Sequence, residues 1–214
     1  MTQTPTQTKT VTPVKKPSPV YDAKRLLEFL KESEGSVRDK KGMHIPYLDQ
    51  AGLPTIGYGT RYYTDGTEVT MDDAPIDEAT ATGHLQTYMT EVADSLMSMP
   101  GFKELNPNQK AALISFGYNF GANFYKDKDN FGIISGAVED KDIKAIQDAF
   151  GLYVNVADDT NEKGYSKSQG LINRRNKELE LFNEPIKVKK PKPKSMYDKY
   201  VNKEEEDPET VSGE

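Results

Sequence analysis

The 214-residue sequence predicts an α+β domain that is mainly helical and carries one small antiparallel sheet. Two observations predict this class. Apolar residues recur at helical spacing in five separate stretches of the chain. The stretch 47–69 is instead rich in glycine, proline, aromatic and β-branched residues, which is typical of short strands joined by turns.

The two ends of the chain differ in composition from the middle. Residues 1–21 carry three lysines and no acids among many Thr and Pro residues, and we expect a disordered arm. Residues 185–214 hold a basic and an acidic block with seven charges of each sign, and we expect a charged, disordered tail. These ends also explain a hydrophobic content of only 35%. Residues 22–184 are therefore the predicted domain.

The predicted elements follow one another in a simple order. Asp22 is a suitable N-cap for the first helix, and the turn signal Tyr-Thr-Asp-Gly at 63–66 lies inside the predicted sheet. Asn106 followed by Pro107 is typical of a helix start, and the residues after them are apolar enough for a central buried helix. The expected helices are 22–33, 77–97, 106–120, 140–153 and 168–182.

Composition excludes several classes of function. The chain has no cysteine and only two histidines, so we expect no disulfide and no metal site. No apolar run is long enough to cross a membrane, and we expect no membrane insertion. The predicted domain holds 18 bases and 27 acids, a net charge of −9, which argues against a nucleic-acid partner.

Three residues near the start of the domain suggest chemistry. Glu34 ends the first predicted helix, Asp49 begins the predicted sheet, and Thr55 lies one short hairpin later. Two carboxylates that flank a cleft can hydrolyse a glycosidic bond, one as general acid and the other as base, nucleophile or charge stabiliser. A neighbouring threonine hydroxyl could hold the attacking water.

The sequences of these segments resemble those of a known family. "EG" followed by "YLDQAGLPTIGYGT" resembles the signature of the phage-type, T4-like lysozymes of glycoside hydrolase family 24. "LNPNQKAALISFGYNFG" is similar to the buried helix of that family, and "GLINRRNKELELF" to its closing helix. The matches occur in the family's order and together cover roughly residues 22–184.

The resemblance implies a lysozyme-like fold, with a small sheet and a helical lobe enclosing a cleft. It implies that Glu34 is the catalytic acid, that Asp49 is the second carboxylate and that Thr55 is its partner near the water. The predicted substrate-binding residues are Tyr118, Asn119 and Arg61. The implied activity is that of a muramidase, which cuts the β-1,4 bond between N-acetylmuramic acid and N-acetylglucosamine in peptidoglycan and needs no cofactor.

The sequence also departs from the family. Fourteen residues, 35–48, separate Glu34 from Asp49, where the family usually has eight. Within this insertion we expect His44 to be a surface residue. Thr60 stands where many relatives have His, and the domain is acidic where many relatives are basic. Residues 127–132, "DKDNFG", are expected to form a solvated loop, because Phe131 could not bind calcium at its position in an EF-hand.

Two readings of the whole chain compete. The first is an endolysin for host cell lysis, which intact Glu34, Asp49 and Thr55 favour. The second is a virion-associated wall-binding or structural protein that keeps the lysozyme fold and has little turnover. For the endolysin we expect a monomer without a signal peptide, made in the host cytoplasm and released to the wall through a membrane lesion.

A fragment of residues 22–184 is expected to keep the wall-degrading rate of the full chain, because it contains every predicted helix and all three candidate catalytic residues. Limited proteolysis should trim the full chain to about these limits, since exposed polar ends are cut first. Protection of residues 195–201 from the protease, or loss of activity in the fragment, would contradict these boundaries.

Overall fold

The computed structural model describes residues 21–49 and 51–186, and the predicted arm and tail lie almost wholly outside them. This part of the chain is mainly helical with two small antiparallel sheets, which confirms the predicted class. The helices are α1 (Ala23–Glu34), α2 (Glu78–Leu96), α3 (Pro107–Phe120), α4 (Lys128–Glu139), α5 (Ile143–Phe150) and α6 (Gln169–Asn183), with short 3-10 turns at Phe102–Glu104 and Phe124–Lys126. The strands are β1 (Tyr47–Leu48), β2 (Pro54–Thr55), β3 (Asn155–Ala157) and β4 (Tyr165–Lys167).

The predicted helix starts are confirmed by their capping bonds. The Asp22 side chain accepts a hydrogen bond from the backbone N of Arg25 at 3.1 Å, at the start of α1. The Asn106 side chain accepts from the backbone N of Gln109 at 3.0 Å, and the Gln109 side chain accepts in return from the backbone N of Asn106. This capping box satisfies backbone donors that a helix start leaves free.

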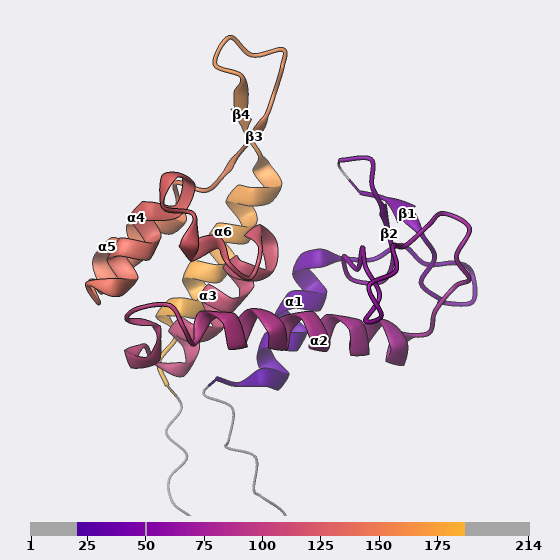
Figure 1. Cartoon of the computed structure of the whole chain (residues 1–214), viewed down its shortest axis with the longest axis horizontal. Helices are drawn as coiled ribbons and strands as arrows, with labels where there is room; N and C mark the ends of the chain where they lie inside the picture. The colour runs from indigo at the N-terminus through magenta and orange to yellow at the C-terminus, as the bar shows by residue number, and fades with distance from the viewer. Residues whose placement is uncertain (1–20, 50, 187–214) are drawn as a thin grey trace, which may run out of the picture. The chain divides into compact units, whose positions relative to one another are not determined.

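The core of the domain is built around α3, as its apolar sequence predicts. Helix α3 packs against α1, α2 and α6, and every residue from Lys110 to Tyr118 is buried. Figure 1 shows α2 running from the short strands at one end to the α3–α6 lobe at the other. The largest fully buried apolar side chains are Leu26, Leu30, Ile56, Leu85, Leu96, Phe102, Leu113, Ile114, Phe116, Phe150 and Phe182.

The predicted sheet is present and is smaller than its sequence range. Strands β1 and β2 pair Tyr47 with Thr55, and single bridges join Ile56 to Thr60 and Tyr62 to Glu68. The strands are short because the chain between them turns tightly on the side chain of Asp49. Its Oδ1 atom accepts hydrogen bonds from the backbone N atoms of Ala51 and Leu53 at 2.8 and 2.9 Å.

Two predictions about single segments are wrong. Residues 127–132 do not form a solvated loop, because the Asp127 side chain caps α4 by accepting from the backbone N of Asn130 at 3.1 Å. His44 is not a surface residue, since its exposed fraction is 0%. Its backbone pairs with Ile76 in both directions, at 2.8 and 2.9 Å, which draws the inserted segment against the start of α2.

The β3–β4 hairpin was not anticipated from the sequence. It pairs Val156 with Ser166 and leads directly into α6, from which it projects in Figure 1. Its strand residues are mostly exposed, so they lack the alternation of apolar and polar residues that marks a half-buried strand.

Gly101 is expected to be intolerant of alanine. Its φ is +80°, and an added Cβ atom would lie 1.8 Å from the carbonyl oxygen of Val138 at the end of α4. Gly66 provides the matched control, with φ +85° and nothing within 4 Å of the added atom. Gly66→Ala should lower the free energy of unfolding by about 1 kcal/mol, and Gly101→Ala by about 3 kcal/mol. Urea denaturation measures both, and equal losses would contradict the close approach.

Candidate active site

A cleft of about 660 Å³ opens between the short strands, α1, α2 and α3. All six residues that the sequence singled out line it: Glu34, Asp49, Thr55, Arg61, Tyr118 and Asn119. They come from segments far apart in the sequence, so the fold assembles the cleft from three separate parts of the chain. Within residues 21–49 and 51–186, no group of three or more His, Cys, Asp or Glu side chains could hold a metal ion.

Glu34 occupies the last position of α1 and faces the cleft with one carboxylate oxygen held in place. Arg174 donates a hydrogen bond from Nη1 to Glu34 Oε1 at 2.7 Å, and the Glu34 side chain is 18% exposed. Gly59 lies against the other oxygen, since a Cβ atom at Gly59 would be 3.6 Å from Glu34 Oε2. The glycine, with φ +92°, leaves room for a substrate beside this carboxylate.

Asp49 and Thr55 line the cleft from a second wall, the β1–β2 hairpin. Asp49 is fixed by the turn that its own Oδ1 atom closes, and Thr55 is buried and donates from Oγ1 to the carbonyl oxygen of Leu53 at 3.1 Å. Tyr47 pairs with Thr55 across the strands, and the charges of both acids act on its hydroxyl. Burial, with the charges of Glu34 and Asp49, raises the pKa of the Tyr47 hydroxyl.

The three predicted substrate-binding residues have different surroundings. Tyr118 is mostly buried and donates from its hydroxyl to the carbonyl oxygen of Tyr58 at 2.9 Å, so it serves both core and cleft. Asn119 is exposed and accepts from Arg175 Nη2 at 3.2 Å. Arg61 is exposed, with its guanidinium carbon 5.9 Å from the ring centroid of the neighbouring Tyr62.

Helix α2 contributes a row of cleft residues that the sequence analysis missed. His84, Thr87, Tyr88 and Glu91 all line the cleft. Their spacing of three, four and seven residues places them on one face of the helix, beside its apolar stripe. The helical spacing of these residues was the signal from which the sequence could have predicted that they line a cleft. The ring of His84 meets Tyr63 edge-on at 5.6 Å, and burial lowers the pKa of the imidazole.

Behind Glu34 lies a buried network of charges on α6. Arg174 contacts Glu178, with 3.2 Å between Nε and Oε1, and also donates from Nη2 to the carbonyl oxygen of Ser115 at 3.2 Å. Ser115 donates its hydroxyl proton to Glu178 Oε1 at 2.7 Å. Arg175 donates from Nη2 to the same oxygen at 2.9 Å, and its guanidinium lies over the ring of Phe116. The network therefore joins the cleft to the core of the helical lobe.

The charges in this network balance, which allows them to be buried. Burial lowers the pKa of Arg175 to about 10 and raises the pKa of Glu178. For Arg174 burial acts in the same direction as for Arg175, but the charges of Glu34 and Glu178 outweigh it and raise the pKa. Two arginines thus face two carboxylates, and removal of any one leaves a buried charge without its partner.

This arrangement suits general acid–base chemistry. Two carboxylates face one open cleft from separate walls, and one of them is anchored by an arginine whose own position is fixed. Glu34 ends a helix, and Asp49 accepts two backbone hydrogen bonds within its turn. Every helix of the described residues is too short or too polar to span a membrane.

One protein family and several solved structures are similar to this chain. Residues 39–178 match the phage lysozyme family. The match begins five residues after Glu34, so the position of Glu34 rests on the structure and on the motif around it. A search of curated protein sequences gave no match.

Several solved structures share the fold. The endolysin from Escherichia coli O157:H7 phage FAHEc1 is 23% identical, with a TM-score of 0.63, over 82% of this chain and 100% of that chain. The muramidase domain of SpmX from Asticaccaulis excentricus is 21% identical, with a TM-score of 0.59, over 77% of this chain and 99% of that one. A mutant of P22 lysozyme is 26% identical, with a TM-score of 0.54, over 74% and 94%. The predicted lysozyme-like fold is confirmed.

Glu178→Gln should lower the free energy of unfolding by about 3 kcal/mol, because it leaves two buried arginines facing a neutral side chain. Glu180→Gln is the matched control, since Glu180 is exposed on the same helix and its substitution should change stability by less than about 0.5 kcal/mol. Urea denaturation of both variants decides the matter. Similar small losses in the two would show that the buried network contributes nothing.

Proposed function

Because the chain belongs to the phage lysozyme family, we propose that it is a muramidase that hydrolyses the β-1,4 bond between N-acetylmuramic acid and N-acetylglucosamine in peptidoglycan. The observation that carries this proposal is that Glu34, Asp49 and Thr55 line one cleft. Glycoside hydrolysis needs two carboxyl groups on either side of the scissile bond, and the cleft supplies them from α1 and from the β1–β2 hairpin.

The proposed roles follow from where each group lies. Glu34 donates a proton to the oxygen of the leaving sugar, and Gly59 leaves the approach to its Oε2 atom open. Asp49, on the other wall, activates water or stabilises the charge that develops on the sugar ring. The Thr55 hydroxyl is beside this wall and holds the attacking water. Tyr118, Asn119 and Arg61 contact the glycan strand.

The biological setting is part of the same proposal. We propose that a single copy of the chain acts as an endolysin in host cell lysis and reaches the wall from the cytoplasm through a membrane lesion. Residues 22–184 are the catalytic domain in this account, with the arm and tail as attachments. A wall-binding protein of the same fold would bind peptidoglycan and release no product.

Product analysis tests the proposed bond. Purified peptidoglycan is incubated with the full chain, the new reducing ends are reduced with borohydride, and the resulting sugar alcohols are identified. The proposal predicts that muramic acid carries the new ends. New ends on glucosamine would show a different glycosidase, and binding without any new ends would favour the wall-binding protein.

Glu34→Gln should lower the rate of peptidoglycan hydrolysis by about 10²- to 10⁴-fold, since the amide keeps the shape of the side chain but its N–H protons are not acidic enough to be transferred to the leaving oxygen. Glu32→Gln is the control, because Glu32 is exposed on the same helix, two residues before Glu34. Circular dichroism should show both variants folded. A Glu34→Gln variant with more than a tenth of the wild-type rate would remove Glu34 from its assigned role.

A further inference from the structure

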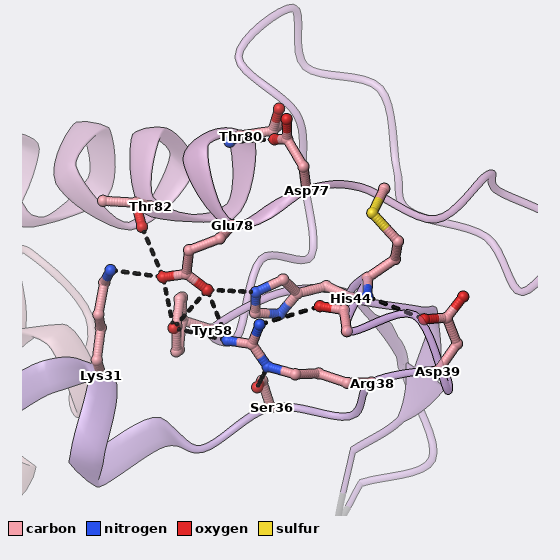
Figure 2. Close-up of polar contacts among 12 residues, drawn as sticks. Lys31, Ser36, Arg38, Asp39, His44, Tyr58, Asp77, Glu78, Thr80 and Thr82 are labelled. Carbon is pink, nitrogen blue, oxygen red and sulfur yellow. Dashed lines mark hydrogen bonds and ion pairs between the residues drawn. The ribbon is translucent and has the colours of Figure 1, made fainter.

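One carboxylate outside the cleft gathers side chains from several segments, as Figure 2 shows. Glu78 is the first residue of α2. Its Oε1 atom lies 2.6 Å from Lys31 Nζ, 2.9 Å from the Tyr58 hydroxyl and 3.1 Å from Thr82 Oγ1, while Oε2 lies 2.6 Å from Arg38 Nη2 and 3.0 Å from His44 Nε2.

Every partner of Glu78 that lies outside α2 belongs to a segment that carries or borders a residue of the cleft. Lys31 lies on α1, three residues before Glu34. Arg38 and His44 lie in the connection that leads from Glu34 to Asp49. Tyr58 precedes Gly59, the residue that lies against the Glu34 carboxylate. The segments that place both proposed catalytic carboxyl groups therefore meet at one side chain.

We propose that Glu78 is a positioning residue for the cleft, which fixes the end of α1, the 35–48 connection and the Tyr58–Gly59 turn relative to the start of α2. This inference rests on the proposed function, because it concerns the placement of Glu34 and Asp49. Nothing in the motif around those two residues points to it, since Glu78 lies 29 residues beyond Asp49 in the printed sequence.

His44 shows why the connection depends on this contact. It is the one buried residue among residues 35–46, and its Nε2 atom meets Glu78. Its Nδ1 atom is buried without a partner among the described residues. An ionised carboxylate only accepts, so the imidazole donates from Nε2. Without Glu78, both ring nitrogens would be buried and unsatisfied, and the connection would shift to expose them.

The cluster is expected to affect geometry more than overall stability. Burial would raise the pKa of Glu78, but the hydrogen bonds from Lys31, Arg38 and His44 outweigh it and hold the pKa far below its usual range. These hydrogen bonds therefore favour the charged form of the carboxylate. Its side chain is 47% exposed, however, and ion pairs in contact with water contribute little to folding.

A simpler reading is that Glu78 stabilises α2 by its negative charge near the helix start. Any acid at this position would do so, and Asp77 already caps the helix by accepting from the backbone N of Thr80 at 2.8 Å. Glu78→Asp separates the readings, because it keeps the charge and shortens the reach by one methylene. The helix-charge reading predicts full activity in this variant, and the positioning reading predicts a loss.

The experiment measures kcat and KM on soluble, uncross-linked glycan strands prepared from purified peptidoglycan. We expect Glu78→Gln and Glu78→Asp to lower kcat by about tenfold, because a displacement of about 1 Å can cost up to 10²-fold, while KM stays within about twofold. Glu139→Gln is the control. Glu139 on α4 makes one exposed ion pair, with Lys128 at 4.0 Å, and its substitution should leave kcat unchanged.

Nuclear magnetic resonance supplies a second readout that overall stability would not move. The chain has two histidines, so the ring nitrogens of His44 and His84 can be followed in one spectrum. In folded Glu78→Gln the Nε2 signal of His44 should shift while the signals of His84 stay in place. An unchanged His44 signal would overturn the inference, because the contact would then be absent.

The outcomes separate this inference from the proposed function. A wild-type chain without turnover would overturn both. An active wild type whose Glu78→Gln variant keeps more than half of kcat would overturn only the positioning role. If Glu78→Gln does not fold, Arg38→Gln gives the same test, since Arg38 is 35% exposed at its side chain and lies outside the core. A severalfold fall in kcat with unchanged KM supports the inference, and an unchanged kcat overturns it.

Discussion

The structure depends on an ion pair between residues that are 140 positions apart, Glu34 on α1 and Arg174 on α6. Arg174 is itself held by Glu178 and by the carbonyl oxygen of Ser115, so the carboxylate at the cleft is tied to the centre of the helical lobe. A buried charge network of this kind adds little net stability, because desolvation offsets most of the attraction. Its contribution is position: it holds one carboxylate oxygen of Glu34 and leaves the other beside Gly59, facing the cleft.

The two walls of the cleft are fixed by different physical means. Glu34 is held by a buried network with balanced charges, whereas Asp49 is held by its own turn and by the hairpin that pairs Tyr47 with Thr55. The connection between the two acids is long, and a long surface loop costs little free energy to close but does not by itself fix its ends. In our account Glu78 supplies that constraint from the solvent side. The 35–48 connection is then part of the structure that positions the cleft, and Glu78 is the contact that fixes it.

The sequence predicted what is encoded locally. The helix starts at Asp22 and Asn106 follow from capping chemistry, and Asp49 and Thr55 are recognisable because one short motif contains them. Helix α4 was missed because its glycines and polar first turn weaken the helical pattern. The burial of His44 and the pairing of Glu34 with Arg174 could not be predicted, since each depends on a partner that the fold brings from a distant segment. The cleft-lining residues of α2 are an intermediate case. Their helical spacing can be read from the sequence, but the cleft that they face cannot.

A double-mutant cycle between Glu34 and Arg174 tests the central claim most directly. The free energy of unfolding is measured by urea denaturation for the wild type, Glu34→Gln, Arg174→Met and the double variant. The cycle cancels the contacts of Arg174 with Glu178 and Ser115 and leaves the coupling between the two side chains. Our account predicts a favourable coupling of about 1–3 kcal/mol, as for contacting residues in one network. A coupling of about zero would show that Arg174 does not hold Glu34, and would contradict the account of how the cleft is built.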